Sequence, residues 1–173
     1  AYMGLYAQQH RGQEGAGVVS SDGKELHRHM GQGLVSDVFS NPEVFDSLVG
    51  DSAIGHVRYS TTGNSEAENV GPLTFNMGDY SLSIAHNGNL VNINGIRKQL
   101  QDDGALFQTS TDPEIIIHLL AREEGNTLAE KLGKVLNKIE GAYSLILLSP
   151  NEIIAARDPH GIRPYCMGKL TDT

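Results

Sequence analysis

The segment Ser144-Leu145-Ile146-Leu147-Leu148 (SLILL) decides the fold that we expect for this chain. Four apolar residues in a row do not alternate with polar ones, so a strand built from them is covered on both faces. Cover on both faces indicates a second sheet on one side and helices on the other. The segment therefore predicts two sheets packed together between helical layers.

Around this segment, the C-terminal part of the chain is predicted to form an antiparallel meander joined by short turns. Its strands are expected in residues 142–150 (AYSLILLSP), 151–159 (NEIIAARDP) and 163–170 (RPYCMGKL). The third of these contains Cys166, for which we expect the buried, inert thiol that is usual for a lone cysteine.

Two or three helices are predicted before the meander, over residues 92–104, 111–125 and 127–141. The second begins with Thr111 three residues before Glu114, which is the spacing of a capping box. The third carries an apolar stripe with a period of 3.6 residues, formed by Leu128, Leu132, Val135, Leu136 and Ile139.

The N-terminal half contains mainly strand patterns. We expect the end of a helix (1–9), a hairpin with its turn at Asp22-Gly23 (15–31), a short helix (41–50), a strand (52–60), a polar loop (63–73) and a strand that runs into a glycine-rich turn (79–89). Because strands precede and follow a block of helices, the order favours an α+β protein with antiparallel sheets over alternating βα units.

Composition restricts the class of protein. The 173 residues fit one domain, 1–173. A formal charge of −8 argues against a nucleic-acid-binding surface, and no apolar run approaches the roughly 20 residues of a membrane span. The single cysteine excludes an internal disulfide and fits a reducing cytoplasm. The seven histidines are scattered without ligand spacing, so we expect no metal site.

The stretch GHVRYSTTG (55–63) ends a predicted strand with Arg58, followed by Tyr59, Ser60 and Thr61. A guanidinium fork beside several hydroxyl groups suits bidentate binding of a carboxylate. The alternative is a surface arginine next to a solvated loop.

Two further stretches offer complementary chemistry. In AHNGN (85–89), the Asn87 amide and the Gly88 backbone N–H are able to donate to one oxyanion, although Asn-Gly is also the commonest hairpin dipeptide. In TSTDPEI (109–115), Asp112 is able to bind a ligand ammonium, or it favours the positive end of the helix.

Two stretches have less specific chemistry. QQHRGQEGAG (8–17) places an arginine and a histidine in a glycine-lined bend. ARDPHGIRP (156–164) is expected to be either an ion-paired structural turn or a contact surface for another domain. The charged side chains of this second stretch are Arg157, Asp158, His160 and Arg163.

Taken together, Arg58, Asp112 and the Asn87-Gly88 pair match the carboxylate, the ammonium and the reacting carbonyl of an α-amino acid such as glutamine. What this set lacks is a nucleophile. A hydrolase that uses Cys166 with His160 as its base is one alternative, and a non-catalytic amino-acid-binding or docking domain is another.

Five stretches in this order (QHRGQEGAG, GHVRYSTTG, AHNGN, STDPE and RDPHGIRP) resemble the glutaminase domain of the class II, or N-terminal-nucleophile, glutamine amidotransferases. The resemblance covers essentially all 173 residues. It implies a four-layer α/β/β/α sandwich of two antiparallel sheets, the N-terminal-nucleophile hydrolase fold.

The same resemblance implies a role for each motif residue. Arg58 would hold the glutamine carboxylate and Asp112 its ammonium. Asn87 and Gly88 would form the oxyanion hole, and Arg11 would help to position the nucleophile strand. The pocket wall would be completed by Tyr59, Ser60 and Thr61.

Within the class, Tyr59, Thr62 and the QHRGQ and RDPHGIRP motifs favour the branch of purine synthesis over the sugar-phosphate branch. The resemblance then implies a transferase that passes ammonia to phosphoribosylpyrophosphate. It also implies a phosphoribosyltransferase domain in the same protein, a homo-oligomer, Mg²⁺ and, in some members, an iron–sulfur cluster in the full-length enzyme. The alternative is the glutaminase domain of another class II enzyme.

One feature departs from the family pattern. In this class the nucleophile is an N-terminal cysteine upstream of the QHRG motif, whereas the present sequence begins with Ala1. We therefore expect the first strand, its cysteine and the phosphoribosyltransferase domain to be missing from this sequence. As written, it is expected to lack glutaminase activity.

Overall fold

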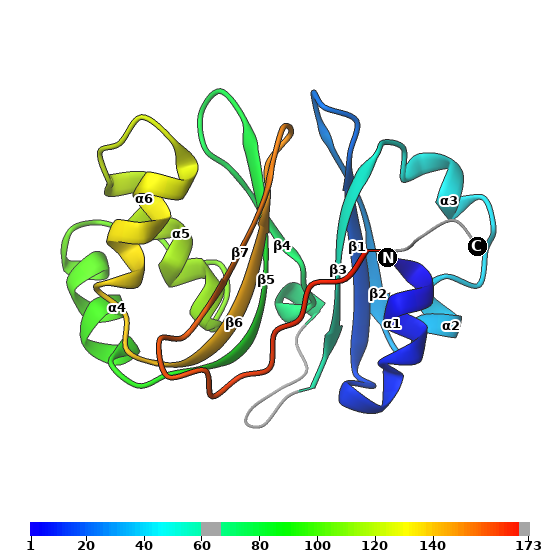
Figure 1. Cartoon of the computed structure of the whole chain (residues 1–173), viewed down its shortest axis with the longest axis horizontal. Coiled ribbons are helices and arrows are strands. Elements are labelled where there is room, and N and C mark those ends of the chain that lie inside the picture. Colours follow the sequence, from blue (N-terminus) through cyan, green and yellow to red (C-terminus); the bar gives the residue numbers. More distant parts are fainter. Residues whose placement is uncertain (60–66, 170–173) are drawn as a thin grey trace.

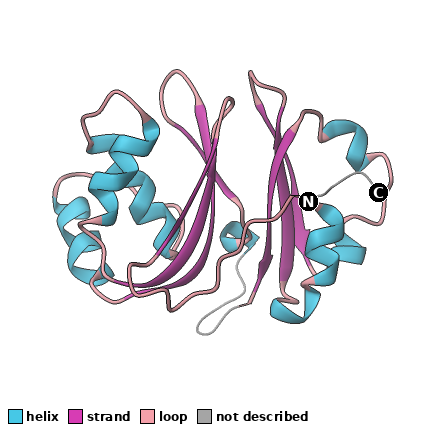
Figure 2. Cartoon of the chain, viewed as in Figure 1, coloured by secondary structure: helices cyan, strands magenta, loops and turns pink. Residues whose placement is uncertain are grey.

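The computed structural model describes residues 1–59 and 67–169. Two antiparallel sheets lie face to face in the middle of the molecule, and helices cover the outer face of each sheet (Figures 1 and 2). This is the α/β/β/α sandwich that the sequence predicted. No helix in these two ranges is long and apolar enough to span a bilayer.

The first sheet has the strand order β2-β1-β3. Its strands are β1 (Gly15–Ser21), β2 (Leu26–Gln32) and β3 (Ser52–Arg58). Its outer layer consists of α1 (Tyr2–Ala7), η1 (Gln9–Arg11), α2 (Val35–Val38) and α3 (Val44–Ser47). The central strand β1 is buried along its whole length, and it forms the predicted hairpin with β2.

The second sheet has the strand order β4-β5-β6-β7. Its strands are β4 (Leu73–Asn76), β5 (Ser81–Leu90), β6 (Gly141–Leu148) and β7 (Ile153–Arg157). Its outer layer consists of α4 (Ile93–Asp102), α5 (Asp112–Arg122) and α6 (Leu128–Leu136), and η2 (Ala67–Asn69) precedes β4.

The strand β6 shows why its sequence is almost continuously apolar. Leu145 and Leu147 pack into the cluster beneath the helices, whereas Leu148 packs with Val19 and Ile54 of the other sheet. Leu147 and Leu148 are both fully buried, and each burial stabilises the fold by about 2 kcal/mol. The prediction that both faces of this strand are covered is confirmed.

The expectation for residues 79–89 is wrong in one respect. The strand does not end in a turn at Asn87-Gly88, because β5 continues to Leu90 and pairs with β6 over this stretch. A hairpin turn needs its partner strand next in the chain, whereas here α4 follows β5 and the partner β6 comes much later. The strand β4 and the helix α2 were not predicted.

The predicted third strand of the meander is also wrong. Residues 158–169 form no strand, and Cys166 is exposed rather than buried. The Asp158 carboxylate accepts hydrogen bonds from the backbone N–H groups of Ile162 and Arg163, which turns the chain away from the edge of β7. The segment then runs across toward the first sheet (red in Figure 1). The 156–164 stretch therefore contains a turn whose backbone N–H groups are held by the Asp158 carboxylate, as expected for a structural turn.

The predicted capping box at the start of α5 is absent. The Thr111 side chain makes no cap hydrogen bond, because the Glu114 carboxylate binds backbone N–H groups further back, at Gln108 and Thr109. A Thr-to-Glu capping pair is found at α6 instead, where the Thr127 side chain accepts from the Glu130 backbone N–H.

Candidate active site between the two sheets

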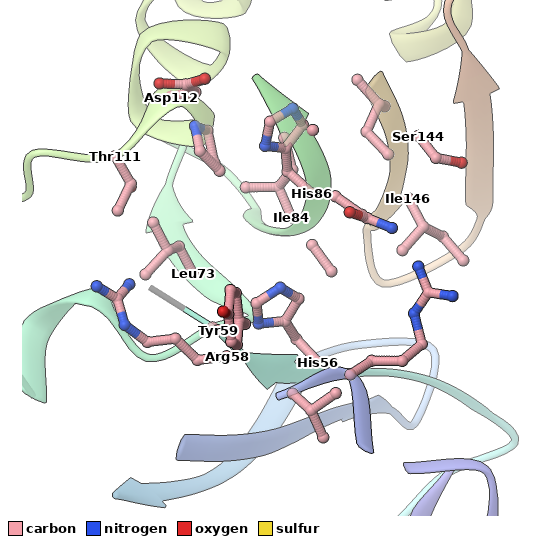
Figure 3. Close-up of a pocket in the computed structure, with 18 of the residues that line it drawn as sticks. His56, Arg58, Tyr59, Leu73, Ile84, His86, Thr111, Asp112, Ser144 and Ile146 are labelled. Carbon is pink, nitrogen blue, oxygen red and sulfur yellow. The ribbon is translucent and has the colours of Figure 1, made fainter. Parts of the chain in front are cut away.

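A cavity of about 670 Å³ lies where β3 of one sheet faces β5 and β6 of the other, beside the start of α5. Figure 3 shows Arg58 and His56 on one side of it and Asp112 and His86 on the opposite side. The structure brings together six of the predicted site residues at this cavity, namely Arg11, Arg58, Tyr59, Asn87, Gly88 and Asp112. Ser60 and Thr61 lie outside the described residues.

Arg58 is the last residue of β3, and its side chain is only 13% exposed. Its Nη1 donates to the Asn69 carbonyl at 2.7 Å, and its Nε lies 3.8 Å from Oε2 of Glu14. These contacts orient the guanidinium while leaving other N–H donors available at the cavity. A fork held in this way suits bidentate binding of a ligand carboxylate.

The glycine-lined bend of residues 8–17 packs against the backbone of Arg58. A Cβ atom on Gly12 would lie 2.6 Å from the Arg58 carbonyl carbon, so only glycine fits there. The Glu14 N–H donates to the Arg58 carbonyl at 3.2 Å. The Gln9 side chain ties the bend together by donating to the Gly12 carbonyl and accepting from the Val35 N–H. The glycine-lined bend therefore positions Arg58 and brings Arg11 to the cavity.

Asp112 is the first residue of α5, and its carboxylate reaches back to β5. Its Oδ2 accepts from the Leu90 N–H at 2.9 Å, which leaves Oδ1 for a second donor. Burial raises the pKa of Asp112, although the Leu90 hydrogen bond and the Arg97 guanidinium oppose that rise. A ligand ammonium is the kind of donor that this partly buried carboxylate binds.

Asn87 and Gly88 lie on β5, opposite Ser144 and Tyr143 of β6. Alternate N–H groups of a strand point to the same side, so the Gly88 N–H points to the side on which the Leu90 N–H meets Asp112. The strand β4 pairs with β5 only over residues 81–84, so it has ended before Gly88. The Gly88 N–H, which forms no hydrogen bond to a neighbouring strand within the described residues, therefore faces the cavity side of β5.

Two cavity-lining histidines were not singled out from the sequence, His56 on β3 and His86 on β5. Burial lowers the pKa of His56 to about 4, because an imidazolium loses hydration there. Burial lowers the pKa of His86 to about 4 as well, and the charge of Arg163 adds to this shift. Both rings are thus neutral at pH 7. The sequence feature that could have identified these histidines is their position in GHVR and AHNG, next to the predicted site residues.

These two histidines predict a stability that falls in mild acid. Their folded pKa values of about 4 lie below the unfolded value of about 6.5, so the unfolded chain binds more protons in that range. Stability is complete above about pH 6.5 and declines as the pH falls toward 4. The expected loss between pH 7 and pH 5 is on the order of 2 kcal/mol for each histidine.

Urea unfolding at the two pH values measures this loss. A His56→Asn variant should show a smaller difference between them, because one of the two titrating rings is gone. An unfolding free energy of the unsubstituted chain that is equal at pH 7 and pH 5 would contradict the assignment.

The described residues contain no group of three or more His, Cys, Asp or Glu side chains that is able to hold a metal ion. The single cysteine of the sequence also cannot supply the ligands of an iron–sulfur cluster. The one cysteine therefore does not fit the iron–sulfur cluster that the family resemblance implied for some full-length enzymes.

Arg58, Asp112, Asn87 and Gly88 thus line one cavity of an α/β/β/α sandwich, which is the arrangement expected for a glutamine amidotransferase domain. A model of the glutamine amidotransferase domain family matches residues 56–173. The amidophosphoribosyltransferase of Lacticaseibacillus casei is 44% identical over 167 residues, which cover 96% of this chain and 86% of that protein. The chain belongs to the amidophosphoribosyltransferase family.

Further relatives agree with this family and are much longer. The Bacillus subtilis amidophosphoribosyltransferase is 46% identical over 172 residues, which cover 99% of this chain and 36% of that protein. Two solved structures superpose with TM-scores of 0.90 and 0.88 at 47% and 46% identity, and 94% of this chain corresponds to 35% of each. They are an allosteric regulatory enzyme of purine biosynthesis and the B. subtilis glutamine phosphoribosylpyrophosphate amidotransferase complexed with ADP and GMP.

Proposed function

We propose that this chain is the glutaminase domain of an amidophosphoribosyltransferase and binds glutamine in the cavity between the sheets. In the complete protein, glutamine is hydrolysed to glutamate, and the ammonia displaces pyrophosphate from phosphoribosylpyrophosphate to give phosphoribosylamine, the first step of de novo purine synthesis. The observation that carries the proposal is the convergence of Arg58, Asp112, Asn87 and Gly88 on one cavity.

The site binds the α-carboxylate and the α-ammonium of the amino acid through separate residues. Arg58 binds the α-carboxylate through its guanidinium fork, and Oδ1 of Asp112 accepts from the α-ammonium. The side-chain carboxamide then lies toward β5, where the Asn87 amide and the Gly88 N–H stabilise the oxyanion that forms when the carbonyl is attacked. The class uses an amino-terminal cysteine as its nucleophile, and the four cavity residues supply binding and oxyanion stabilisation.

The proposal extends to the partners of the complete protein. It includes a phosphoribosyltransferase domain in the same polypeptide, assembly as a homo-oligomer and a cytoplasmic location. The similarity to proteins about three times as long as the matched region, named for both activities, supports the first of these. We assign Mg²⁺ and any iron–sulfur cluster of a full-length amidophosphoribosyltransferase to parts of that protein outside the residues of this chain.

Calorimetric titration with L-glutamine tests the binding site directly. We expect binding of L-glutamine at neutral pH and much weaker binding of two truncated analogues. Glutaramate lacks the ammonium that Asp112 binds, and γ-aminobutyramide lacks the carboxylate that Arg58 binds. Each analogue leaves one buried charge unpaired, so each should bind at least about tenfold more weakly.

The Asp112→Asn variant is the matched control for this titration. It keeps the size of the side chain but loses the charge, so it should reduce the affinity for L-glutamine while leaving the weak binding of glutaramate unchanged. Equal affinities for L-glutamine and for both analogues would refute the proposed site.

A further inference from the structure

The segment between α4 and α5, residues 103–111, is held by the carboxylate of Glu114 in the first turn of α5. Glu114 is 1% exposed and accepts three hydrogen bonds from this segment. Its Oε1 accepts from the Gln108 N–H at 2.7 Å, and its Oε2 accepts from the N–H and the hydroxyl of Thr109 at 2.6 and 2.8 Å. A buried carboxylate with three donors holds these residues in one path.

Arg97 of α4 holds the same segment from the other side. Its Nη1 donates to the Thr109 carbonyl at 3.2 Å, and its Nη2 donates to the Thr111 carbonyl at 3.3 Å. The guanidinium carbon also lies 4.1 Å from the centre of the Phe107 ring, in the geometry of a cation–π contact. One side chain thus spans the segment up to the residue before Asp112.

These contacts replace the usual helix cap. The Thr111 hydroxyl lies 2.9 Å from the Thr109 hydroxyl and makes no cap hydrogen bond to α5. The position of the first turn of α5 is therefore set by Glu114 and Arg97, which act through the backbone of the preceding segment. Asp112 is the first residue of that turn and reaches the cavity from it.

We propose that Arg97 and Glu114 are positioning residues, which hold residues 108–111 in the path that presents the Asp112 carboxylate to the ligand ammonium. This inference rests on the proposed function, because it assigns their role through the glutamine site. Neither residue lines the cavity itself.

Arg97 also acts on the charge of Asp112. Among the described residues, the charged or titratable groups around this end of the cavity are Arg97 of α4, Glu114 and His118 of α5, His86 of β5 and Arg58 of β3. The positive charge of Arg97 lowers the pKa of Asp112 against the opposing effect of burial. Without Arg97, Asp112 takes up its proton at a higher pH, so binding of an ammonium ligand is lost earlier as the pH falls.

The experiment is a titration of the chain with L-glutamine at a series of pH values between about 5 and 8. Arg97→Met keeps the aliphatic stem over Phe107 but removes both hydrogen bonds and the charge. We expect about a tenfold weaker affinity for L-glutamine at neutral pH, because hydrogen bonds from a charged group are lost. We also expect the loss of affinity at low pH, the acid limb of the affinity–pH profile, to begin at a higher pH. Arg97→Lys keeps the charge and should restore the position of the acid limb.

Lys98→Met is the matched control, because it removes a neighbouring cation of α4 that is 74% exposed and pairs with Asp102. It should change neither the affinity nor the pH profile. Glu114→Gln is the second variant, since its amide NH₂ would face the N–H donors of the segment, and it should weaken binding without displacing the acid limb as Arg97→Met does. Circular dichroism verifies that each variant is folded.

The outcomes separate the two proposals. If the unsubstituted chain does not distinguish L-glutamine from its truncated analogues, the proposed function fails. If it does, and a folded Arg97→Met variant keeps both the affinity and the pH profile, the positioning role is wrong. A loss of affinity in Arg97→Met with an unchanged acid limb would likewise overturn the role assigned to its charge.

Discussion

Replacing Arg58 with alanine is expected to weaken L-glutamine binding by a factor of about a hundred or more. Truncating one partner of a buried, hydrogen-bonded charge pair costs about 2–5 kcal/mol, much of it because the other charge is left unpaired. Arg58 is the cation of the cavity whose guanidinium is already oriented by Asn69 and Glu14. The affinity, measured by calorimetry at pH 7.5, gives the answer.

Two further variants make the Arg58 result specific. Arg58→Lys keeps the charge but loses the planar fork, so it should recover only part of the affinity. Arg28→Ala removes an exposed arginine from β2 of the same sheet, away from this cavity, and should bind L-glutamine as the unsubstituted chain does. An Arg58→Ala variant with unchanged affinity would remove Arg58 from the site.

Substituting Gly88 with alanine is expected to lower the free energy of unfolding by about 3 kcal/mol. A Cβ atom at this position would lie 2.1 Å from the Ala142 carbonyl oxygen and 2.7 Å from the Cα of Tyr143. Both contacts are with the backbone of β6, where the Tyr143 carbonyl also accepts from the Asp158 N–H on the far side, so this backbone has little room to move. Urea unfolding monitored by circular dichroism measures the loss.

Gly95→Ala provides the contrast. This glycine lies inside α4, and no atom is within 4 Å of the Cβ that the substitution would add. Alanine should therefore stabilise the chain by about 0.5–1 kcal/mol, because it has the higher helix propensity. Equal effects of the two substitutions would show that β5 does not approach β6 as closely as the structure describes.

The Gly88 result also bears on the proposed glutamine site, since any shift of β5 moves the Gly88 N–H and the neighbouring Asn87 amide. A folded Gly88→Ala variant should still bind the amino acid ends through Arg58 and Asp112. In the complete enzyme its larger defect is expected in turnover, because an oxyanion donor acts on the transition state rather than on the bound ground state.

The motif residues show which structural features a local sequence pattern predicts. GHVR ends a strand and STDPE begins a helix, and both placements follow from periodicity and from the residues that flank them. Asn87-Gly88 has the local signature of a turn, yet it lies within a strand. The difference arises because the glycine is required by the close approach of β6, a contact between residues more than fifty positions apart.

Glu114 shows the same limit for a polar residue. Its spacing from Thr111 is that of a capping box, and local preference alone favours that interaction. Burial changes the outcome, because a carboxylate at 1% exposure must satisfy both oxygens and finds its donors in the folded segment before the helix. The two cavity histidines were overlooked for a related reason, since their low pKa values come from burial.

The amino-acid sequence by itself determined the α+β class, the two covered sheets and the residue types at the proposed glutamine site, because hydrophobic periodicity and short motifs are local properties of the chain. The tertiary structure alone decided which of those residues meet. Arg58, Gly88 and Asp112 come from β3, β5 and α5, and they converge on one cavity only through the packing of one sheet on the other. Contacts between distant segments depend on the whole packed core, and no local pattern encodes them.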